Sequence, residues 1–348
     1  MSEPPAAPPR RPSRPALNYL LSASLTIVFL YLAFRGTNLD SLLEAMGRAD
    51  YLWLGVNVLV LMVSHAFRAW RWRYLLEPMK PAIGLRNLFS GVMVGYMMNN
   101  VLPRAGELVR PYVIGKLESI SKSAAFGTIV VERILDTVSF LLLVAAMPVL
   151  YNGPLTESFP WLTRAGVILT CIMVPAVALL IALMMRRDWA DRLLGLFTHL
   201  LPERFARRVQ GLFHSFLDGF QFVKNPGNFL VIFILSALIW FLYAAMTYAG
   251  FLALGLQNAI GFRGAVVTLA ISSIGVSMPT PGSTGTYHAF ASQALIRLYA
   301  IDQVTALSFA TLTHATGFIG ATVVGLYFFL KDKVSFAEAM QRRARSSV

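Results

Sequence analysis

Three ionisable residues lie inside an apolar segment that is long enough to cross a membrane: Glu132, Arg133 and Asp136. Glu132 and Asp136 are four residues apart, so a helix places both carboxylates on one face, and Arg133 can pair with Asp136. Ionisable groups are costly inside a membrane, and those found there are usually functional. One arginine neutralises only one carboxylate, so the second is expected to need a cation from another segment.

Arg104 and Arg110 are the expected sources of that cation, in a break of proline and glycine that also contains Asn100, another residue with a predicted binding role. Glu107 lies three residues before Arg110 and is expected to form a second pair with it. These charges favour a site that binds an anionic headgroup. The alternative is a buried ion-pair network that only fixes helix packing, and such networks often add little net stability.

A second break lies in the other half of the chain, in the stretch Pro279-Thr-Pro-Gly-Ser-Thr-Gly285. Its prolines prevent helix continuation, and its glycines permit close approach of the backbone. If a half-helix begins after Gly285, its N-terminus is a ready site for a phosphate group. The alternative is a plain helix break with a turn. The residues here with a predicted binding role are Pro281, Gly282, Gly285, Tyr287 and His288.

Both breaks must be held by membrane-spanning helices. In lipid, irregular backbone survives only where it is buried in protein or lines an aqueous cavity. Two such breaks, one in each half of the chain, favour a transport path over a structural anchor. Of the 348 residues, 56% are hydrophobic and 14% are charged, and the mean hydropathy is +0.62. Soluble domains carry roughly a quarter charged residues, so the composition is that of a membrane protein.

The sequence predicts an all-α, polytopic membrane protein with six full spans and two re-entrant helical hairpins, or eight membrane segments. The hairpins cover residues 84–122 and 263–300, with the two breaks at or near their tips. The positive-inside rule places both termini in the cytoplasm. The hairpins then enter from opposite faces, as in an inverted repeat, although no residue-level repeat is clear. The predicted full spans are 17–34, 51–67, 124–150, 161–185, 227–254 and 305–330.

The remaining segments are expected at the membrane surface or in solvent. Residues 65–73 alternate aromatic and basic side chains, which favours an interfacial belt with snorkelling arginines, with a headgroup site as the alternative. The loop 186–224 is expected to form an amphipathic helix on the inner leaflet. Residues 1–16 and 333–348 are predicted to be basic tails, the first of them disordered, around a single membrane domain at 17–332.

The composition also excludes several classes of partner and cofactor. The net charge of +13 is explained by basic residues in loops beside the spans, so no nucleic-acid partner is predicted. A single cysteine, Cys171, leaves no internal disulfide framework and no thiolate metal cluster. The five histidines have no metal-binding spacing, so no metal site and no cofactor are predicted. No Walker motif is present, so ATP-driven pumping by this chain is not expected.

Three stretches, 100–110, 131–136 and 279–285, together resemble the flippase-like family related to the transmembrane region of lysylphosphatidylglycerol synthase, which includes hopanoid-associated members. The likeness extends from about residue 17 to 332. It implies a multi-pass inner-membrane protein that moves aminoacylated, polyprenyl-linked or hopanoid-type lipids between leaflets. The aminoacyl-transferase domain of bifunctional relatives does not appear in this sequence, so that activity is not expected. The family often has glycine in place of Ser283 and an acidic residue near His288.

The function expected from these features is that of a lipid flippase or transporter rather than an enzyme. Its partners would be membrane lipids with polar or anionic headgroups, together with enzymes of lipid synthesis. One alternative is an integral-membrane enzyme that modifies headgroups, with Glu132, Asp136 and His288 as acid and base. Another alternative is a secondary transporter of small solutes.

Overall fold

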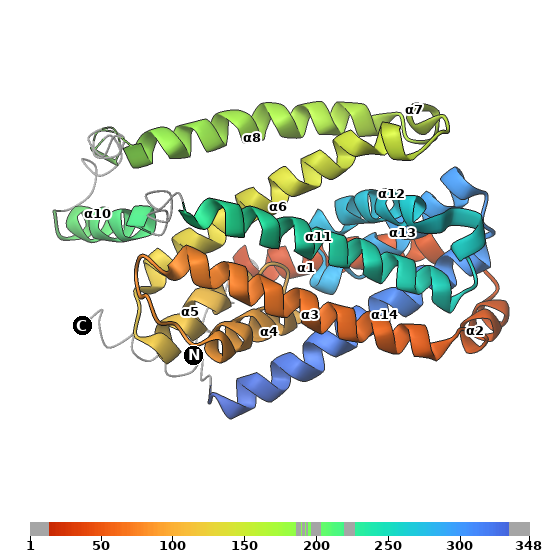
Figure 1. Cartoon of the computed structure of the whole chain (residues 1–348), viewed down its shortest axis with the longest axis horizontal. Helices are drawn as coiled ribbons and strands as arrows, with labels where there is room; N and C mark the ends of the chain where they lie inside the picture. Colours follow the sequence, from red (N-terminus) through yellow and green to blue (C-terminus); the bar gives the residue numbers. More distant parts are fainter. Residues whose placement is uncertain are drawn as a thin grey trace, which may run out of the picture.

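The computed structural model of the protein describes residues 14–185, 189, 192, 194–195, 203–218 and 227–333. All regular secondary structure in these ranges is helical (Figure 1), which confirms the predicted all-α class. The predicted tails and much of the loop 186–224 lie outside the described residues. The helices are α1 Arg14–Phe34, α2 Leu39–Gly47, α3 Tyr51–Leu76, α4 Leu85–Val101, α5 Gly106–Glu118, α6 Lys122–Leu150, α7 Leu155–Ser158, α8 Trp161–Met185, α10 Glu203–Asp218, α11 Gly227–Ala253, α12 Gln257–Ser277, η2 Pro281–Ser283, α13 Thr286–Tyr299 and α14 Gln303–Lys331.

Six long helices, α1, α3, α6, α8, α11 and α14, begin within three residues of the six predicted spans. By length and composition, α3, α11, α12 and α14 can each cross a membrane, and α1 with α2 forms a bent pair that would be a fifth span. Helix α12 was expected to be part of a hairpin. It is interrupted at Gly261, which has a φ of 67°. The part that follows is about 24 Å long, shorter than a hydrocarbon core of roughly 30 Å.

Helices α4 and α5 form the first hairpin, joined by residues 102–105. Arg104 in this turn has a φ of 59°, in the left-handed region. Asn99 holds the turn, since its Oδ1 accepts a hydrogen bond from the backbone N–H of Gly106 at 2.7 Å. The helices touch at Gly106, where a Cβ atom would lie 2.2 Å from the carbonyl oxygen of Gly95. A side chain at residue 106 would push the two helices apart, which explains the glycine in this break.

Helices α12 and α13 form the second hairpin, with η2 at its tip. The expected half-helix is confirmed, because α13 begins at Thr286, directly after Gly285. Gly285 has a φ of 83°, and a Cβ atom there would lie 2.7 Å from the carbonyl oxygen of Thr26 in α1. Thr286 is fully buried. The N-terminus of α13 is therefore packed against α1.

The two hairpin tips meet beside the middle of α14. Asn100, at the first tip, donates from Nδ2 to the carbonyl oxygen of Phe318 at 3.1 Å and to Oγ1 of Thr322 at 2.8 Å. Arg104 donates from Nη2 to the carbonyl oxygen of Ser277, at the end of α12, at 2.9 Å. Phe318 lies about halfway along α14, so each hairpin covers one half of that helix.

The bases of the hairpins lie at opposite ends of α14. Asp332, directly after α14, accepts hydrogen bonds from Arg86 and Ser90 in the first two turns of α4. Helix α13 ends three residues before Asp302, the N-cap of α14. The hairpins therefore approach from opposite ends of the bundle, as the sequence predicted, and the structure shows in addition that their tips meet.

The element order shows two structural repeats. Helices α3–α6 and α11–α14 each consist of a long helix, a hairpin of two helices and a second long helix. Helix α3 packs on α11, the hairpin helix α4 packs on α14, and the hairpin helix α12 packs on α6 (Figure 1). Because the two hairpins enter from opposite ends, the repeats are inverted relative to each other. Inverted repeats with broken helices are common in secondary transporters.

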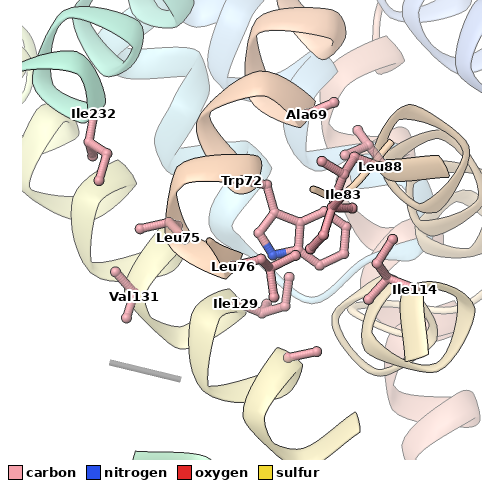
Figure 2. Close-up of a cluster of buried hydrophobic side chains, with 12 residues drawn as sticks. Ala69, Trp72, Leu75, Leu76, Ile83, Leu88, Ile114, Ile129, Val131 and Ile232 are labelled. Atoms are coloured by element: carbon pink, nitrogen blue, oxygen red, sulfur yellow. The ribbon is translucent and has the colours of Figure 1, made fainter. Parts of the chain in front are cut away.

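An apolar core fixes the relative positions of α3, α4, α5 and α6 (Figure 2). Trp72 of α3 is fully buried in a cluster with Leu88 of α4, Ile114 of α5 and Ile129 of α6. Its Nε1 donates to Oγ1 of Thr128 at 2.8 Å, so the one polar atom of this indole is satisfied. Close packing of this kind, rather than transfer out of water, drives helix association in lipid.

The amphipathic helix α10 lies in the predicted surface loop. Phe205 and Leu212 on this helix are exposed, whereas Phe216 packs against Phe126 of α6 with ring centroids 6.1 Å apart. Exposed apolar side chains on an amphipathic helix are typical of segments that lie in the membrane interface. The helix thus has the features expected for this loop.

Candidate functional site

Four arginines from three helices surround two carboxylates inside the bundle. Arg68 and Arg71 lie three residues apart on α3, so they share one face. Arg68 donates from Nη1 to Oε1 of Glu132 at 2.6 Å and to Oδ2 of Asp136 at 2.8 Å. Arg71 donates from Nη2 to Oδ1 of Asp136 at 2.8 Å. We call these residues the ionic cluster: Arg68, Arg71, Arg110, Glu132, Arg133 and Asp136.

Arg110 ties the first hairpin to the cluster. Its two terminal nitrogens donate to the two carboxylate oxygens of Glu132, at 2.7 and 2.9 Å. This bidentate geometry is the strong form of an arginine–carboxylate pair. The guanidinium group also lies 4.4 Å from the ring centre of Trp72, where a cation–π interaction holds it in place. The close contact of α4 and α5 at Gly106 thus places Arg110, one turn further along α5, beside Glu132.

Arg133 is the accessible member of the cluster. It donates from Nη2 to Oε1 of Glu132 at 3.0 Å and lies 3.2 Å from Oδ2 of Asp136. Its side chain is 43% exposed, whereas that of Asp136 is 13% exposed and those of the other members are buried. A ligand that approaches the cluster would therefore meet Arg133 first.

Helix α11 adds neutral partners on the far side of the arginines. The hydroxyl group of Tyr243 accepts from Nη2 of Arg68 at 2.9 Å. The hydroxyl group of Ser236 accepts from Nη1 of Arg71 at 2.9 Å. These groups add hydrogen-bond acceptors without negative charge. The first helix of the second repeat thus helps to orient the cations of the first repeat.

The ionic cluster carries an excess of positive charge. Its four guanidinium groups face two carboxylates, so two positive charges are left unbalanced. Arginine does not lose its proton in proteins, so this excess persists at any working pH. In addition, the Nε atoms of all four arginines are buried and have no hydrogen-bond partner among the described residues. A buried cationic group with unused donors is suited to bind an anion.

The sequence predicted part of this arrangement. The pairing of Arg133 with Asp136 and the role of Arg110 as an added cation are both confirmed. The predicted pair of Glu107 with Arg110 is wrong, because both terminal nitrogens of Arg110 bind Glu132. Arg104 was also expected to serve as a cation for the carboxylates, and this is wrong because it reaches a backbone oxygen of α12 at the hairpin tip.

The interfacial belt predicted at residues 65–73 is wrong for its two central arginines. Arg68 and Arg71 are buried and point into the bundle, while Trp70 and Arg73 lie on the exposed face of α3. The carboxylates of α6 compensate their charges, and α3 continues to Leu76, beyond the predicted end of the span at residue 67. The spacing of three residues between the arginines was the available signal, since it places both on one helical face.

The second hairpin brings a different set of polar residues together. The hydroxyl oxygens of Tyr287 and Thr313 are 2.9 Å apart. His314 of α14 lies 2.9 Å, through its Nε2, from the carbonyl oxygen of Gly282, and its ring centroid is 4.7 Å from that of His288. Tyr287 and His288 thus join α13 to α14, as Arg110 joins α5 to α6. The predicted binding roles of Pro281, Gly282 and Gly285 remain predictions.

At the base of the first hairpin, Glu118 forms a separate polar group with Lys80 and Asn87. Lys80 Nζ lies 2.6 Å from Oε2 of Glu118, and Asn87 Nδ2 donates to Oε1 at 2.7 Å. Partial burial of the carboxyl group opposes ionisation, but these hydrogen bonds outweigh it and hold the pKa of Glu118 below its ordinary value. The contact fixes the end of α5 to the segment after α3.

Comparison with known proteins places this architecture among membrane proteins. A family model described as the lysylphosphatidylglycerol synthase TM region matches residues 19–325. A UPF0104 membrane protein of Methanothermobacter thermautotrophicus is 29% identical over 253 residues, which are 70% of this chain and 74% of the relative. A UPF0104 membrane protein of Pyrococcus horikoshii is 25% identical over 90% of this chain and 96% of its own length.

A third relative is longer than this chain. The Glycosyltransferase AglD of Haloferax volcanii is 24% identical over 351 aligned residues. The alignment covers 92% of this chain but 56% of the relative. The shared region is therefore a module that occurs both in chains of this size and in a longer protein.

Proposed function

Because this chain belongs to the family of the lysylphosphatidylglycerol synthase transmembrane region, we propose that it is a flippase-type transporter that moves a polar or anionic lipid between membrane leaflets. The family takes its name from a protein that makes a membrane lipid. The longer relative named as a glycosyltransferase shares the same membrane module. Aminoacylated, polyprenyl-linked and hopanoid-type lipids are the candidate substrates.

The observation that carries this proposal is the unbalanced positive charge of the ionic cluster. Removing a cation from water costs several kcal/mol unless a counter-charge compensates it. A structural ion-pair network would minimise this penalty with equal numbers of both signs, whereas this cluster has four arginines and two carboxylates. An anionic headgroup would supply the missing counter-charge.

The hairpins suggest how the headgroup would cross. Arg133 would receive it, Arg110 would bind it, and Glu132 and Asp136 would hold the arginines in place. The acyl chains would stay in the bilayer. The contact of the two tips, at Asn100 and Arg104, would separate the two sides and open as the inverted repeats rearrange.

The second hairpin would form the opposite half of the path. Its tip residues Pro281, Gly282 and Gly285 would shape the gate, and Tyr287 and His288 would offer polar contacts beyond it. Glu107, in the first turn of α5, would lie near the entrance. Alternating access between two inverted units around one site is the general mode of such transporters.

The enzyme alternative needs Glu132, Asp136 and His288 to act on one substrate. In the structure, both carboxylates are engaged by arginines, whereas His288 lies against Phe34 and His314. This separation favours transport over acid–base chemistry. The proposal further places the protein in the inner membrane with both termini in the cytoplasm, with lipids as its ligands and lipid-synthesis enzymes as its protein partners.

Purified protein in vesicles tests this function. Headgroup-labelled lipids are placed in one leaflet, and their movement is compared between vesicles with protein and vesicles without it. We expect faster movement of at least one anionic lipid, recovered chemically unchanged. Recovery of a modified lipid would favour the enzyme, and uptake of soluble phosphate compounds without lipid movement would favour a solute carrier.

A further inference from the structure

The charge balance of the ionic cluster bears on which lipid it binds. Three of the arginines, Arg68, Arg71 and Arg110, are buried and already exceed the two carboxylates by one charge. Arg133, the accessible arginine, adds a second unbalanced charge. Among the described residues, the other side chains that accept hydrogen bonds from these arginines are the hydroxyl groups of Tyr243 and Ser236, which are neutral.

A ligand with one negative charge would leave the occupied cluster cationic. At a separation of 4 Å, two unit charges interact by about 4 kcal/mol at an effective dielectric constant near 20. Neutralising the second charge is therefore strongly favoured, even after part of the gain is lost to desolvation of the ligand. A headgroup with two charges matches the cluster better than a zwitterion or a monoanion.

The unused hydrogen-bond donors lead to the same conclusion independently. Each of the four arginines has a buried Nε–H group for which the described part of the chain offers no acceptor. A buried donor left unpaired costs about 1–3 kcal/mol. A terminal phosphate presents three strong acceptor oxygens and carries about −1.5 to −2 charges at neutral pH. A phosphodiester carries a single charge and fewer free oxygens.

We propose that the ionic cluster selects lipids with a dianionic phosphate headgroup, a phosphomonoester or a diphosphate, and that Arg133 sets this preference by supplying the second unbalanced charge. This inference rests on the proposed function and specifies its substrate class. Arg133 is the specificity-determining residue because it is the accessible arginine of the cluster. It also forms ion pairs with both carboxylates, Glu132 and Asp136.

The test measures binding rather than transport. The apparent melting temperature of purified protein is followed against short-chain phosphatidic acid, phosphatidylglycerol and phosphatidylcholine, which carry about two, one and no net negative charges at neutral pH. Ligand binding to the folded state raises the melting temperature by mass action, so each titration yields a Kd. Glycerol 3-phosphate, which has the same phosphate without acyl chains, separates a lipid ligand from a soluble one.

Three variants accompany the wild type. Arg133→Gln removes the second charge, and Arg133→Lys keeps the charge while removing the planar fork. Arg263→Gln is the matched control, since Arg263 is an exposed arginine on α12 outside the cluster. We expect phosphatidic acid to bind about tenfold or more tightly than phosphatidylglycerol in the wild type, in Arg133→Lys and in Arg263→Gln. In Arg133→Gln the two lipids should bind within about threefold of each other.

The possible results distinguish failure of the dianion preference from failure of lipid transport. Equal or tighter binding of phosphatidylglycerol by the wild type, or an unchanged preference in Arg133→Gln, would overturn the dianion inference and leave a lipid transporter. Binding of glycerol 3-phosphate as tight as that of phosphatidic acid would support the dianion inference and contradict the lipid function. Binding of none of these ligands would overturn both.

Discussion

Glu132 is the residue on which the cluster most depends, so Glu132→Gln is the most informative single substitution. The carboxylate is fully buried and accepts from Arg68 at 2.6 Å, from Arg110 at 2.7 and 2.9 Å and from Arg133 at 3.0 Å. A glutamine of the same size keeps one oxygen and turns an NH₂ group toward guanidinium donors. The positive excess of the cluster then rises from two charges to three.

The expected loss of stability follows from these contacts. Removing one partner of a buried ion pair costs about 3–5 kcal/mol, because the other charge is left uncompensated. Here three arginines lose their shared acceptor, so the upper part of that range applies. At about 2–4 °C per kcal/mol for a chain of this order of size, the melting temperature should fall by about 10 °C or more.

The assay is thermal unfolding of purified protein at one fixed heating rate, since unfolding of such proteins is often irreversible. Glu107→Gln is the matched control, because Glu107 forms no ion pair with Arg110 and its loss should shift the melting temperature by no more than about 3 °C. Adding Arg110→Gln to Glu132→Gln restores an excess of two charges and should cost less than the sum of the single losses. A shift below 3 °C for Glu132→Gln would refute the cluster as a coupled unit.

Three further predictions concern the hairpins. Gly106→Ala should destabilise the protein by about 1–3 kcal/mol or more, because the new Cβ would lie 2.2 Å from the carbonyl oxygen of Gly95. Gly317→Ala is the control in thermal unfolding. A Cβ at residue 317 meets nothing within 4 Å, so this variant should be as stable as the wild type or more stable. Asn100→Ala removes both bonds to α14 and should raise hydrogen exchange of both tips, residues 98–106 and 278–286, with no rise in α8. Ionised Glu118 stabilises the folded protein fully above its ordinary pKa of 4.5, and this stabilisation is lost as the pH falls through the lower pKa of the folded state. Glu118→Gln should therefore lower the melting temperature at pH 6 and lower it less at pH 3.5.

Much of the fold could be predicted because membrane spans and helix breaks leave strong local signals. The apolar runs fixed where the long helices begin, and the prolines and glycines near Pro103 and Gly282 fixed the hairpin tips. The charge asymmetry of the loops was enough to infer that the hairpins oppose each other. The meeting of the tips at Phe318 could not be read from the sequence, since it depends on packing against α14.

The site was predicted only in its local part. The spacing of Glu132, Arg133 and Asp136 on one helix revealed the carboxylates and one partner. Arg68 and Arg71 were assigned to the membrane surface because they follow an apolar run among aromatic side chains. A pairing of residues more than sixty positions apart depends on how α3 packs on α6, and no local pattern contains that information.

In the proposed mechanism, the ionic cluster carries an anionic headgroup across the membrane. The most direct test is the rate of movement of labelled phosphatidic acid in vesicles that contain equal amounts of folded wild type, Arg110→Gln or Arg263→Gln. We predict that the wild type and Arg263→Gln move the lipid at similar rates, while Arg110→Gln loses about tenfold or more, because its bidentate contact with Glu132 holds the cluster together. Wild-type movement by a folded Arg110→Gln protein would contradict the account.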